Sequence, residues 1–368
     1  MTKPSLAFPL WSLAAVAMVA TVAAMTPIQG DFAAPAPAMA VTKPGSLSPQ
    51  QWQPWRDRFM TADGRIVDDA NKNISHSEGQ GYGLLLAVLA QDRAAFARIW
   101  GFTRRELLLR DDGLAVWRWD PAASPHVADV NNASDGDILI AYALALAGES
   151  WNSPELTTAA QELAKAIGRV LVKRVGDRTL LMPAAKGFAA DERPDGPVVN
   201  LSYWIFEALP VLARLAPDPD WAALADSGRE LVLAARFGPA RLPANWISLH
   251  SAAPAPAGGF DPLFGYDAIR IPLYLVRAGL LDRSLLEPFA KSGGAAADAP
   301  AVVNLADGHA ANALGDPGYR MIAATVACAL DRKPIPVSLR TPAPTNYYPS
   351  TLHLLALATI SQNYPECL

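Results

Sequence analysis

The dominant pattern along the chain is helical. Apolar residues recur three and four positions apart in most long stretches, and the strict alternation that is typical of half-buried strands is nearly absent. We therefore expect about eleven helices and hardly any strand. The stretches with this pattern are residues 51–60, 83–90, 94–109, 138–147, 156–172, 201–215, 221–235, 271–280, 284–290, 319–330 and 351–360.

The predicted helices follow one another in pairs. The segments between them are rich in Pro, Gly, Asp and Asn, and no change in composition marks a second domain. Several helices, such as residues 137–147, are apolar nearly all round, as expected of an inner layer that other helices cover. This organisation predicts a single all-α domain over residues 45–368, with surface loops at the low-complexity stretches 252–259 and 292–301.

The N-terminus has the features of a secretory signal peptide. Lys3 precedes an uncharged run of about sixteen residues, and small residues that suit cleavage follow it. The run is shorter than the roughly 20 residues that a membrane-spanning helix needs, so the pattern favours export over a membrane anchor. We expect residues 1–40 to be a signal peptide and an Ala/Pro-rich spacer, with cleavage after Ala24 or Ala40. The mature chain is then periplasmic or secreted, without a membrane span.

Composition narrows the class of ligand. The chain has 368 residues, of which 51% are hydrophobic and 18% charged, enough for a large core. The net charge is -4 and the basic residues are scattered, so we expect no nucleic-acid partner. Ten Trp and nine Tyr are many for this length, and aromatic rings often meet the flat faces of sugars, although core packing explains most of them. Cys328 and Cys367 can pair in an oxidising compartment, but two cysteines make no disulfide framework.

The most informative stretch, residues 75–86, reads Ser-His-Ser-Glu-Gly-Gln-Gly-Tyr-Gly-Leu-Leu-Leu. Ser77 and Gln80 have the spacing of a capping box, which predicts that a helix begins at Glu78. The three glycines that follow Glu78 are poor helix formers, so we expect them to allow close approach of a bulky ligand to the backbone. A phosphate-binding loop is excluded because the third glycine of that motif is missing and no strand precedes it. The alternative is a capped helix with a solvated Glu.

A second polar segment, residues 131–137, reads Asn-Asn-Ala-Ser-Asp-Gly-Asp. Ser134 and Asp137 again have capping-box spacing, which places Asp135 in the first turn of an otherwise apolar helix. The helix N-terminus stabilises negative charge, so we expect Asp135 to stay ionised. It lies on the buried face, where an unpaired charge is costly. The alternative is a structural N-capping network.

A third segment, residues 264–272, reads Phe-Gly-Tyr-Asp-Ala-Ile-Arg-Ile-Pro. Pro272 indicates that a helix begins late, around Ile269, which leaves Asp267 on the loop at the helix start. The alternative is that Asp267 and Arg270 simply form an ion pair.

Three acidic residues at helix starts suggest carboxylate chemistry on a carbohydrate. Glycoside hydrolysis needs one protonated carboxyl group that donates to the leaving oxygen and one carboxylate that acts on the other face of the sugar. Competing sets of catalytic residues are missing. The five histidines show no metal-binding spacing and no Gly-x-Ser-x-Gly motif occurs, so we expect neither a metal nor a cofactor.

Taken together, the three segments resemble the signature segments of glycoside hydrolase family 8. The matching residues are 77–83, 133–137 and 265–270, and the similarity extends from about Trp52 to Tyr364. Within the family, the resemblance is strongest to the endoglucanases encoded with bacterial cellulose synthase. It implies an (α/α)6 toroid of six helical hairpins, a substrate cleft across the starts of the inner helices, and hydrolysis of β-1,4-glucan with inversion.

The resemblance also implies roles for individual residues. Glu78 matches the general acid, and Asp267 matches the general base that activates water. Asp135 matches the third acidic residue of the family, which holds the sugar at the cleavage site. Trp117 and Trp119 lie two positions apart, so on an extended segment both can face the cleft, and the resemblance does not decide which of them stacks on sugar. The other implied substrate-binding residues are Tyr203, Tyr266 and Arg270.

The sequence thus predicts an exported endo-β-1,4-glucanase that acts on cellulose chains during their synthesis and secretion. Its expected partners are a β-1,4-glucan chain and the cellulose synthase or export complex. Two alternatives stay open. One is a non-catalytic glycan-binding scaffold of the export machinery, and the other is an enzyme of the same fold that acts on chitosan, xylan or mixed-linkage glucan.

Overall fold

The computed structural model describes residues 43–290 and 300–368. All of these residues belong to one unit, Ala38–Leu368. The expected signal peptide and spacer lie outside the described residues, as does most of the expected loop at residues 292–301.

The described residues form twelve α-helices, close to the number that the apolar spacing predicts. The apolar spacing did not predict the four-residue helix α11, which accounts for the difference. The helices are α1 (Pro49–Phe59), α2 (Ser77–Leu89), α3 (Arg93–Glu106), α4 (Ser134–Ser150), α5 (Pro154–Leu171), α6 (Leu209–Leu215), α7 (Trp221–Ala234), α8 (Ile271–Arg277), α9 (Arg283–Ala290), α10 (Pro317–Asp331), α11 (Val337–Arg340) and α12 (Tyr347–Asn363).

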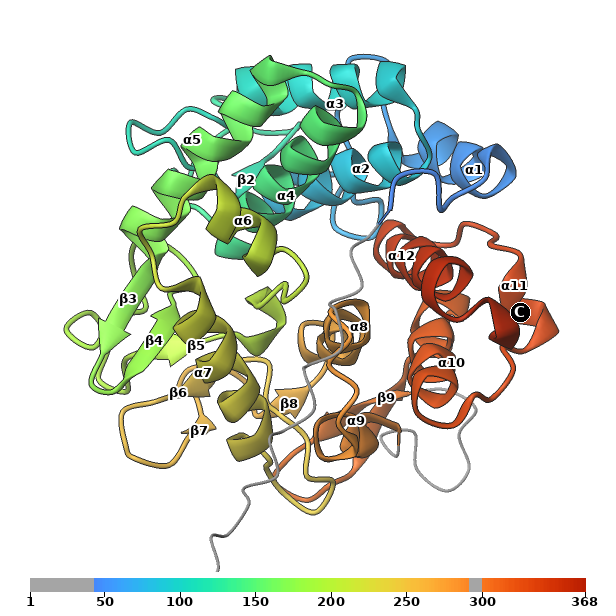
Figure 1. Cartoon of the computed structure of the whole chain (residues 1–368). Coiled ribbons are helices and arrows are strands. Elements are labelled where there is room, and N and C mark those ends of the chain that lie inside the picture. The colour runs from blue at the N-terminus through green and yellow to red at the C-terminus, as the bar shows by residue number, and fades with distance from the viewer. Residues whose placement is uncertain (1–42, 291–299) are drawn as a thin grey trace, which may run out of the picture. The chain divides into compact units, whose positions relative to one another are not determined.

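Within the described unit the helices alternate between an outer and an inner position around a ring (Figure 1). The even-numbered helices lie inside and the odd-numbered helices lie outside. The ring closes because α12, near the end of the chain, packs against both α10 and α2. Helices α2, α4, α8 and α12 consist almost entirely of buried residues, which explains why their sequences are apolar nearly all round. This is the (α/α)6 arrangement that the family resemblance implies.

The expected helix over residues 201–215 is broken. It consists of a short 3-10 helix, η1 (Leu201–Tyr203), and helix α6, which begins only at Leu209. Pro210 stands at the start of α6, where a missing backbone N–H costs nothing. The break makes Tyr203 the last residue of η1, before the start of the inner helix α6.

Strands are more numerous than expected, but all are short. The ten strands of the described residues have two to four residues each and form small antiparallel sheets in the connections. They are β1 (Ser75–His76), β2 (Arg118–Trp119), β3 (Val172–Val175), β4 (Arg178–Leu181), β5 (Val198–Val199), β6 (Ile247–Ser248), β7 (Ala255–Pro256), β8 (Leu263–Phe264), β9 (Ala301–Asn304) and β10 (Ala310–Ala313). Strand β7 lies within the stretch 252–259 that was expected to be a loop. Segments this short carry too little alternation to be recognised in the sequence.

Two glycines of α2, Gly81 and Gly83, allow close packing within the protein, and the expected ligand contact is wrong for these two. A Cβ atom on Gly81 would lie 2.5 Å from the Cβ atom of Leu139 on α4, and one on Gly83 would lie 2.7 Å from the side chain of Ile66. Gly136 on α4 has the same property, since its Cβ would lie 2.1 Å from Oγ of Ser77. Gly81 and Gly136 therefore allow α2 and α4 to approach closely, which brings the starts of these two inner helices together.

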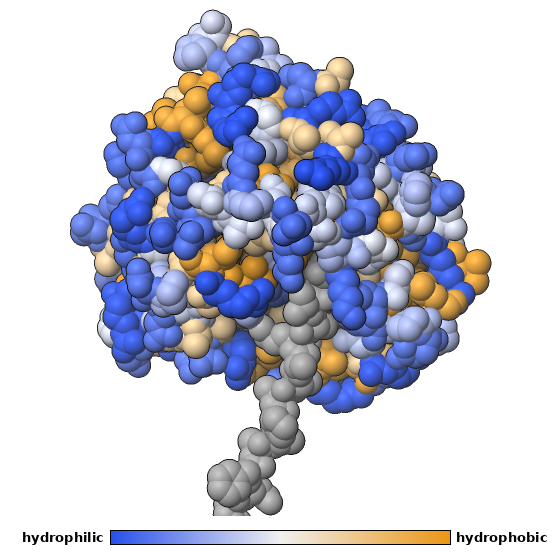
Figure 2. Space-filling model, turned by 45° about the horizontal axis from the view of Figure 1, so that its top comes forward, coloured by the Kyte–Doolittle hydropathy of each residue, from blue (hydrophilic) through white to orange (hydrophobic). Residues whose placement is uncertain are grey.

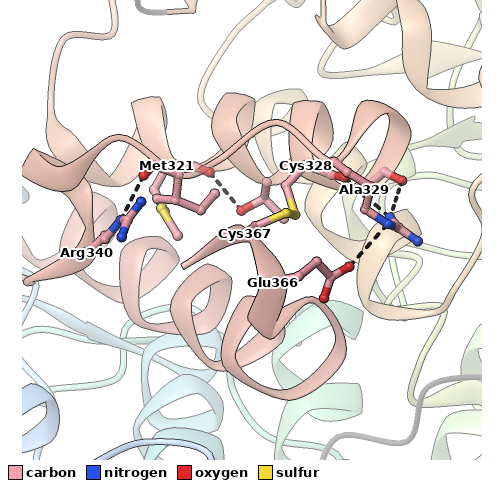
Figure 3. The surroundings of a disulfide bond; sticks show 9 residues. Met321, Cys328, Ala329, Arg340, Glu366 and Cys367 are labelled. Carbon is pink, nitrogen blue, oxygen red and sulfur yellow. Dashed lines mark hydrogen bonds and ion pairs between the residues drawn. A yellow bond between two sulfur atoms is a disulfide. The ribbon is translucent and has the colours of Figure 1, made fainter.

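A disulfide joins Cys328 on α10 to Cys367 in the C-terminal 3-10 helix η3 (Pro365–Cys367). Glu366 lies beside it (Figure 3) and forms an ion pair with Arg332, whose Nε is 3.2 Å from Oε1 of Glu366. The backbone N–H of Ile335 donates to the carbonyl of Cys367 at 2.8 Å. The two cysteines thus pair, and the bond fastens the end of the chain to an inner helix.

Loss of this disulfide should lower the free energy of unfolding by roughly 3 to 4 kcal/mol, because the bond closes a loop of 39 residues. The measurement is guanidinium unfolding of the protein with and without a reducing agent. A double variant, Cys328→Ser with Cys367→Ser, is the control, since its unfolding midpoint should not respond to the reductant. Equal midpoints for the oxidised and reduced protein would contradict this expectation.

The surface of the described residues carries few large apolar side chains. Figure 2 shows a mainly hydrophilic face on which hydrophobic residues form separate small groups. The large hydrophobic residues that are exposed are Leu109, Val130, Leu233, Tyr266, Val337 and Leu368. They are scattered along the chain, and Tyr266 is the member of this set that the sequence associates with substrate.

Candidate active site

A cleft of about 640 Å³ opens at the starts of the inner helices. The beginnings of α2, α4 and α12 contribute to its wall, together with the turn before α8. Five carboxylates line it, and three of them, Glu78, Asp135 and Asp267, are the candidates from the sequence, although they are far apart in the chain. Four of the five residues expected to bind substrate also line it, namely Trp117, Tyr203, Tyr266 and Arg270.

Arg270 connects two of the three carboxylates. Its side chain is 2% exposed, donates a hydrogen bond to Glu78, and donates another to Oδ2 of Asp135 at 2.7 Å. The ion pairs of Arg270 in the described residues are with these two groups, so the alternative that Arg270 simply pairs with Asp267 is wrong. A buried guanidinium between two carboxylates compensates charge that burial alone would make costly.

The start of α2 is capped differently from the expectation. The N-cap is His76, whose Nδ1 accepts the N–H of Gly79 at 2.9 Å. Gln80 does not reach back to the cap. Its side chain is fully buried, accepts the N–H of Ile66 at 2.6 Å and donates to Thr103 at 3.0 Å. The predicted capping box at Ser77 is therefore wrong, because Gln80 is used to fasten the connection after α1 to α2 and α3.

The expected capping box at the start of α4 is also wrong. The N-cap is Ala133, without a side-chain hydrogen bond. Asp137 instead accepts the N–H of Ala115 and the side-chain amide of Asn132, both at 2.8 Å. Burial raises the pKa of Asp137 to about 7, although these two hydrogen bonds oppose the shift. Asp137 thus holds the segment that leads to Trp117 against α4.

Burial decides the electrostatics of Asp135. The residue is 2% exposed, and burial raises its pKa to about 6; the charge of Glu78 acts in the same direction, while Arg270 and the N–H of Gly136 oppose it. The expectation that the helix N-terminus keeps Asp135 ionised considered only one of these effects. Because the dipole of a helix contributes at most about 2 kcal/mol, burial outweighs it here.

Asp267 lies on a turn before the 3-10 helix η2 (Ala268–Arg270), as Pro272 indicates in the sequence. The turn is held by Asn245, whose Oδ1 accepts the N–H of Gly265 at 3.0 Å and of Ala268 at 3.1 Å. Burial raises the pKa of Asp267, and the charge of Glu78 adds to this, whereas Arg270 and the amide of Asn200 lower it.

The structure separates the two tryptophans. Trp117 lines the cleft, and its indole N–H donates to Asp129 at 2.7 Å. Trp119 is not among the lining residues of the cleft. Its ring packs on His126 with 4.2 Å between the ring centres, and it also contacts Phe102. Of the two rings, both of which could face the cleft from an extended segment, Trp117 is the one that lines it.

Several lining residues were not identified from the sequence. Tyr348 donates from its hydroxyl group to the backbone carbonyl of Tyr266 at 2.8 Å, so the start of α12 supports the turn that carries Asp267. The sequence analysis looked for polar residues at the starts of α2 and α4. The same search at the start of α12 would have found Asn346, Tyr347 and Tyr348. The unidentified lining residues include Asp68, His76, Asp316, Tyr319, Asn346, Tyr347 and Tyr348.

An inner ring of helices whose starts bring Glu78, Asp135 and Asp267 and several aromatic rings into one cleft has the form of a glycoside hydrolase. Comparison with known proteins agrees with this class. The chain belongs to glycosyl hydrolase family 8, whose family model matches residues 22–362. The (α/α)6 fold that the sequence predicts is the fold of this family.

Individual relatives are similar over most of their length. The chain is 37% identical over 298 residues to the probable endoglucanase of Novacetimonas hansenii, which covers 80% of this chain and 84% of the relative. The structure of the endo-beta-1,4-glucanase CMCax from Acetobacter xylinum matches with a TM-score of 0.76 and 35% identity, over 85% of this chain and 97% of that one. Endoglucanase Cel10 from Klebsiella pneumoniae, a family 8 glycosyl hydrolase, matches with a TM-score of 0.76 and 33% identity, over 85% and 99%.

Two further observations concern residues 43–290 and 300–368. No helix there is both long and apolar enough to cross a membrane. No group of three or more His, Cys, Asp or Glu side chains in these segments is arranged to hold a metal ion.

Proposed function

We propose that this protein is an exported endo-β-1,4-glucanase that cleaves β-1,4-glucan with inversion. The observation that carries the proposal is that Glu78, Asp135 and Asp267 line one cleft from three separate helix starts. Inverting hydrolysis uses two carboxyl groups on opposite sides of the scissile bond, with room for a water molecule beside the base. Glu78 acts as the general acid and Asp267 as the general base.

Arg270 and Asp135 complete the proposed centre. Asp135 is hydrogen-bonded to Arg270 through one carboxylate oxygen, Oδ2, and accepts the N–H of Gly136 through the other. This leaves it well fixed at the cleft wall, where it binds sugar hydroxyl groups at the cleavage site. Arg270 separates its negative charge from that of Glu78. Aromatic side chains at the wall, such as Trp117 and Tyr266, provide flat surfaces for glucose rings.

Export and a role in cellulose secretion belong to the same proposal. The N-terminal pattern is typical of a signal peptide, and the disulfide between Cys328 and Cys367 is of the kind that persists in oxidising compartments such as the periplasm. The role in cellulose synthesis and the contact with a synthase or export complex rest on the sequence resemblance described above.

The proposal is tested by product analysis on a panel of polysaccharides. Soluble substituted cellulose should release reducing ends with a rapid fall in viscosity, and NMR of the first product should detect the α-anomer. Preferential cleavage of chitosan, xylan or mixed-linkage glucan would assign the substrate to one of those polymers instead. Binding of cellulose oligosaccharides without cleavage of any polymer would support the non-catalytic scaffold.

Replacing Trp117 by Ala should lower kcat/KM on cellulose oligosaccharides about tenfold, mainly through KM. Loss of one stacking ring costs about 1 kcal/mol beyond its buried area. Trp119→Ala is the matched comparison. Because Trp119 packs on Phe102 and His126, its loss should lower the free energy of unfolding by about 2 kcal/mol or more with a smaller effect on KM. If Trp119→Ala raises KM and Trp117→Ala mainly lowers the free energy of unfolding, then Trp119 is the ring that contacts the sugar.

A further inference from the structure

His76 lies in the cleft wall and has no part in the proposed mechanism. It is the N-cap of α2, two residues before Glu78. Both of its ring nitrogens have partners. Nδ1 accepts the N–H of Gly79 at 2.9 Å, and Nε2 lies 3.3 Å from Oδ2 of Asp68. Its ring also packs edge-on against Tyr347, with 5.7 Å between the ring centres.

These contacts determine the protonation state of the imidazole. A backbone N–H that points at Nδ1 requires a lone pair there, so the single ring proton of neutral His76 is on Nε2, from which it is donated to Asp68. An imidazole is an unusual N-cap in a position where Ser, Thr, Asp and Asn are preferred. Unlike Asp, it caps the helix without adding a negative charge next to Glu78.

Protonation of His76 would change both functions of the ring. Nδ1 would carry a proton, so it would no longer accept the N–H of Gly79 and the first turn of α2 would lose its cap. The new N–H would lie next to Glu78, whose Oε2 is 3.7 Å from Nδ1. A cation at this distance favours the carboxylate form of Glu78, which has no proton to donate.

The charges that face His76 make this protonation accessible. Burial lowers its pKa, but the hydrogen bond to Asp68 and the negative charges of Glu78, Asp68 and Asp135 outweigh burial, so that the pKa is raised. Two of these carboxylates, Glu78 and Asp135, also pair with Arg270. From α12, the hydroxyl group of Tyr347 is buried and has no hydrogen-bond partner.

The geometry points to a role for His76, oriented by Asp68, as a positioning residue that caps the helix of the general acid while neutral and disables that acid when it becomes protonated. This inference rests on the proposed function. Its consequence is that the acid side of the pH-rate profile is set by His76 together with the general base, and not by the base alone.

The kinetic test compares kcat/KM against pH for His76→Asn and Asp68→Asn. Asn at position 76 keeps an acceptor for the N–H of Gly79 but does not titrate. Asn at position 68 keeps an acceptor for His76 but removes the charge that favours the imidazolium. Both variants should move the acid limb to lower pH, by roughly half a unit or more. His250→Asn, in an exposed residue outside the cleft, is the control and should leave the limb where it is.

A purely structural cap gives a different result. It would lower kcat at every pH in the His76→Asn protein without moving the acid limb, and an unmoved limb in both variants overturns the inference. Thermal unfolding of both variants distinguishes a change in the profile from loss of folded protein. If one variant does not fold, the other still decides the direction of the shift.

A second readout does not depend on activity. In the protein labelled with ¹⁵N in its histidines, NMR should identify a His76 signal with the proton on Nε2 at alkaline pH, and lowering the pH should convert it to imidazolium. The signal is assigned by its absence in the His76→Asn protein, since the chain has five histidines. A proton on Nδ1 at alkaline pH overturns the inference. Failure of the proposed function can be distinguished from failure of this inference. If the protein is not a glucanase, hydrolysis is absent at every pH, but the NMR result for His76 is unaffected.

Discussion

Replacing Glu78 by Gln should lower kcat on β-1,4-glucan by about 10²- to 10⁴-fold, the usual contribution of a general acid. Gln keeps the size of the side chain but cannot donate a proton to the leaving oxygen. Binding of cellulose oligosaccharides, measured by calorimetry, should persist because Trp117 and Asp135 are untouched. Arg270 keeps its second partner, Asp135, so the fold of the cleft should survive.

The role of Glu78 as an acid can be separated from any role in binding. A cellulose oligosaccharide with a dinitrophenyl leaving group needs no proton donor, so the Glu78→Gln protein should hydrolyse it at close to the rate of the unaltered protein. Glu155→Gln, in a side chain that is 81% exposed on α5, is the control and should behave like the unaltered protein on both substrates. Equal loss of activity on the two substrates would contradict the assignment of Glu78 as the acid.

Replacing Asp267 by Ala should cause a loss of similar size, because water is then no longer activated on the other face of the sugar. The dinitrophenyl substrate should not restore this variant, since leaving-group departure is not its defect. Azide should restore it in part. Azide attacks without a base, and attack from the position of the water should give the α-glycosyl azide, which NMR of the product identifies.

The two variants thus have opposite rescue patterns, which makes the assignment of roles testable as a pair. If azide restores the Glu78→Gln protein instead, and the dinitrophenyl substrate restores the Asp267→Ala protein, the two roles are exchanged. Asp267→Asn is the size-matched control, which should be as inactive as Asp267→Ala but leave less room for azide. Formation of a β-glycosyl azide would contradict inversion.

Much of the fold follows from local pattern. Apolar spacing locates nearly all of the helices because a helix that packs on one side must repeat its apolar residues with the period of the helix. The pattern fails where an element is short. Helix α11 has four residues and the strands have two to four, so neither contains a full period of burial. The break between η1 and α6 was also missed, although Pro210 was a signal for it.

Local pattern was less reliable for the function of polar side chains. Both predicted capping boxes are absent, because Gln80 and Asp137 are used to hold neighbouring segments and not their own helix ends. Gly81 and Gly83 of α2 were expected to meet a ligand, but Gly81 meets α4 and Gly83 meets Ile66. In each case the residue spacing is present in the sequence, but the side chain or glycine contacts a residue from another part of the chain.

The sequence by itself determined the helical architecture and the position of three carboxylates at helix starts, because periodicity and helix-breaking residues act within a few positions. Only the tertiary structure decided how those carboxylates are used. Arg270 reaches Glu78 and Asp135 across 192 and 135 positions, and neither contact has a signature in the local sequence. The same holds for the choice of Trp117 over Trp119 and for the contact of His76 with Asp68. All of these contacts depend on which segments the ring of helices brings close together, and that proximity is a property of the packed fold.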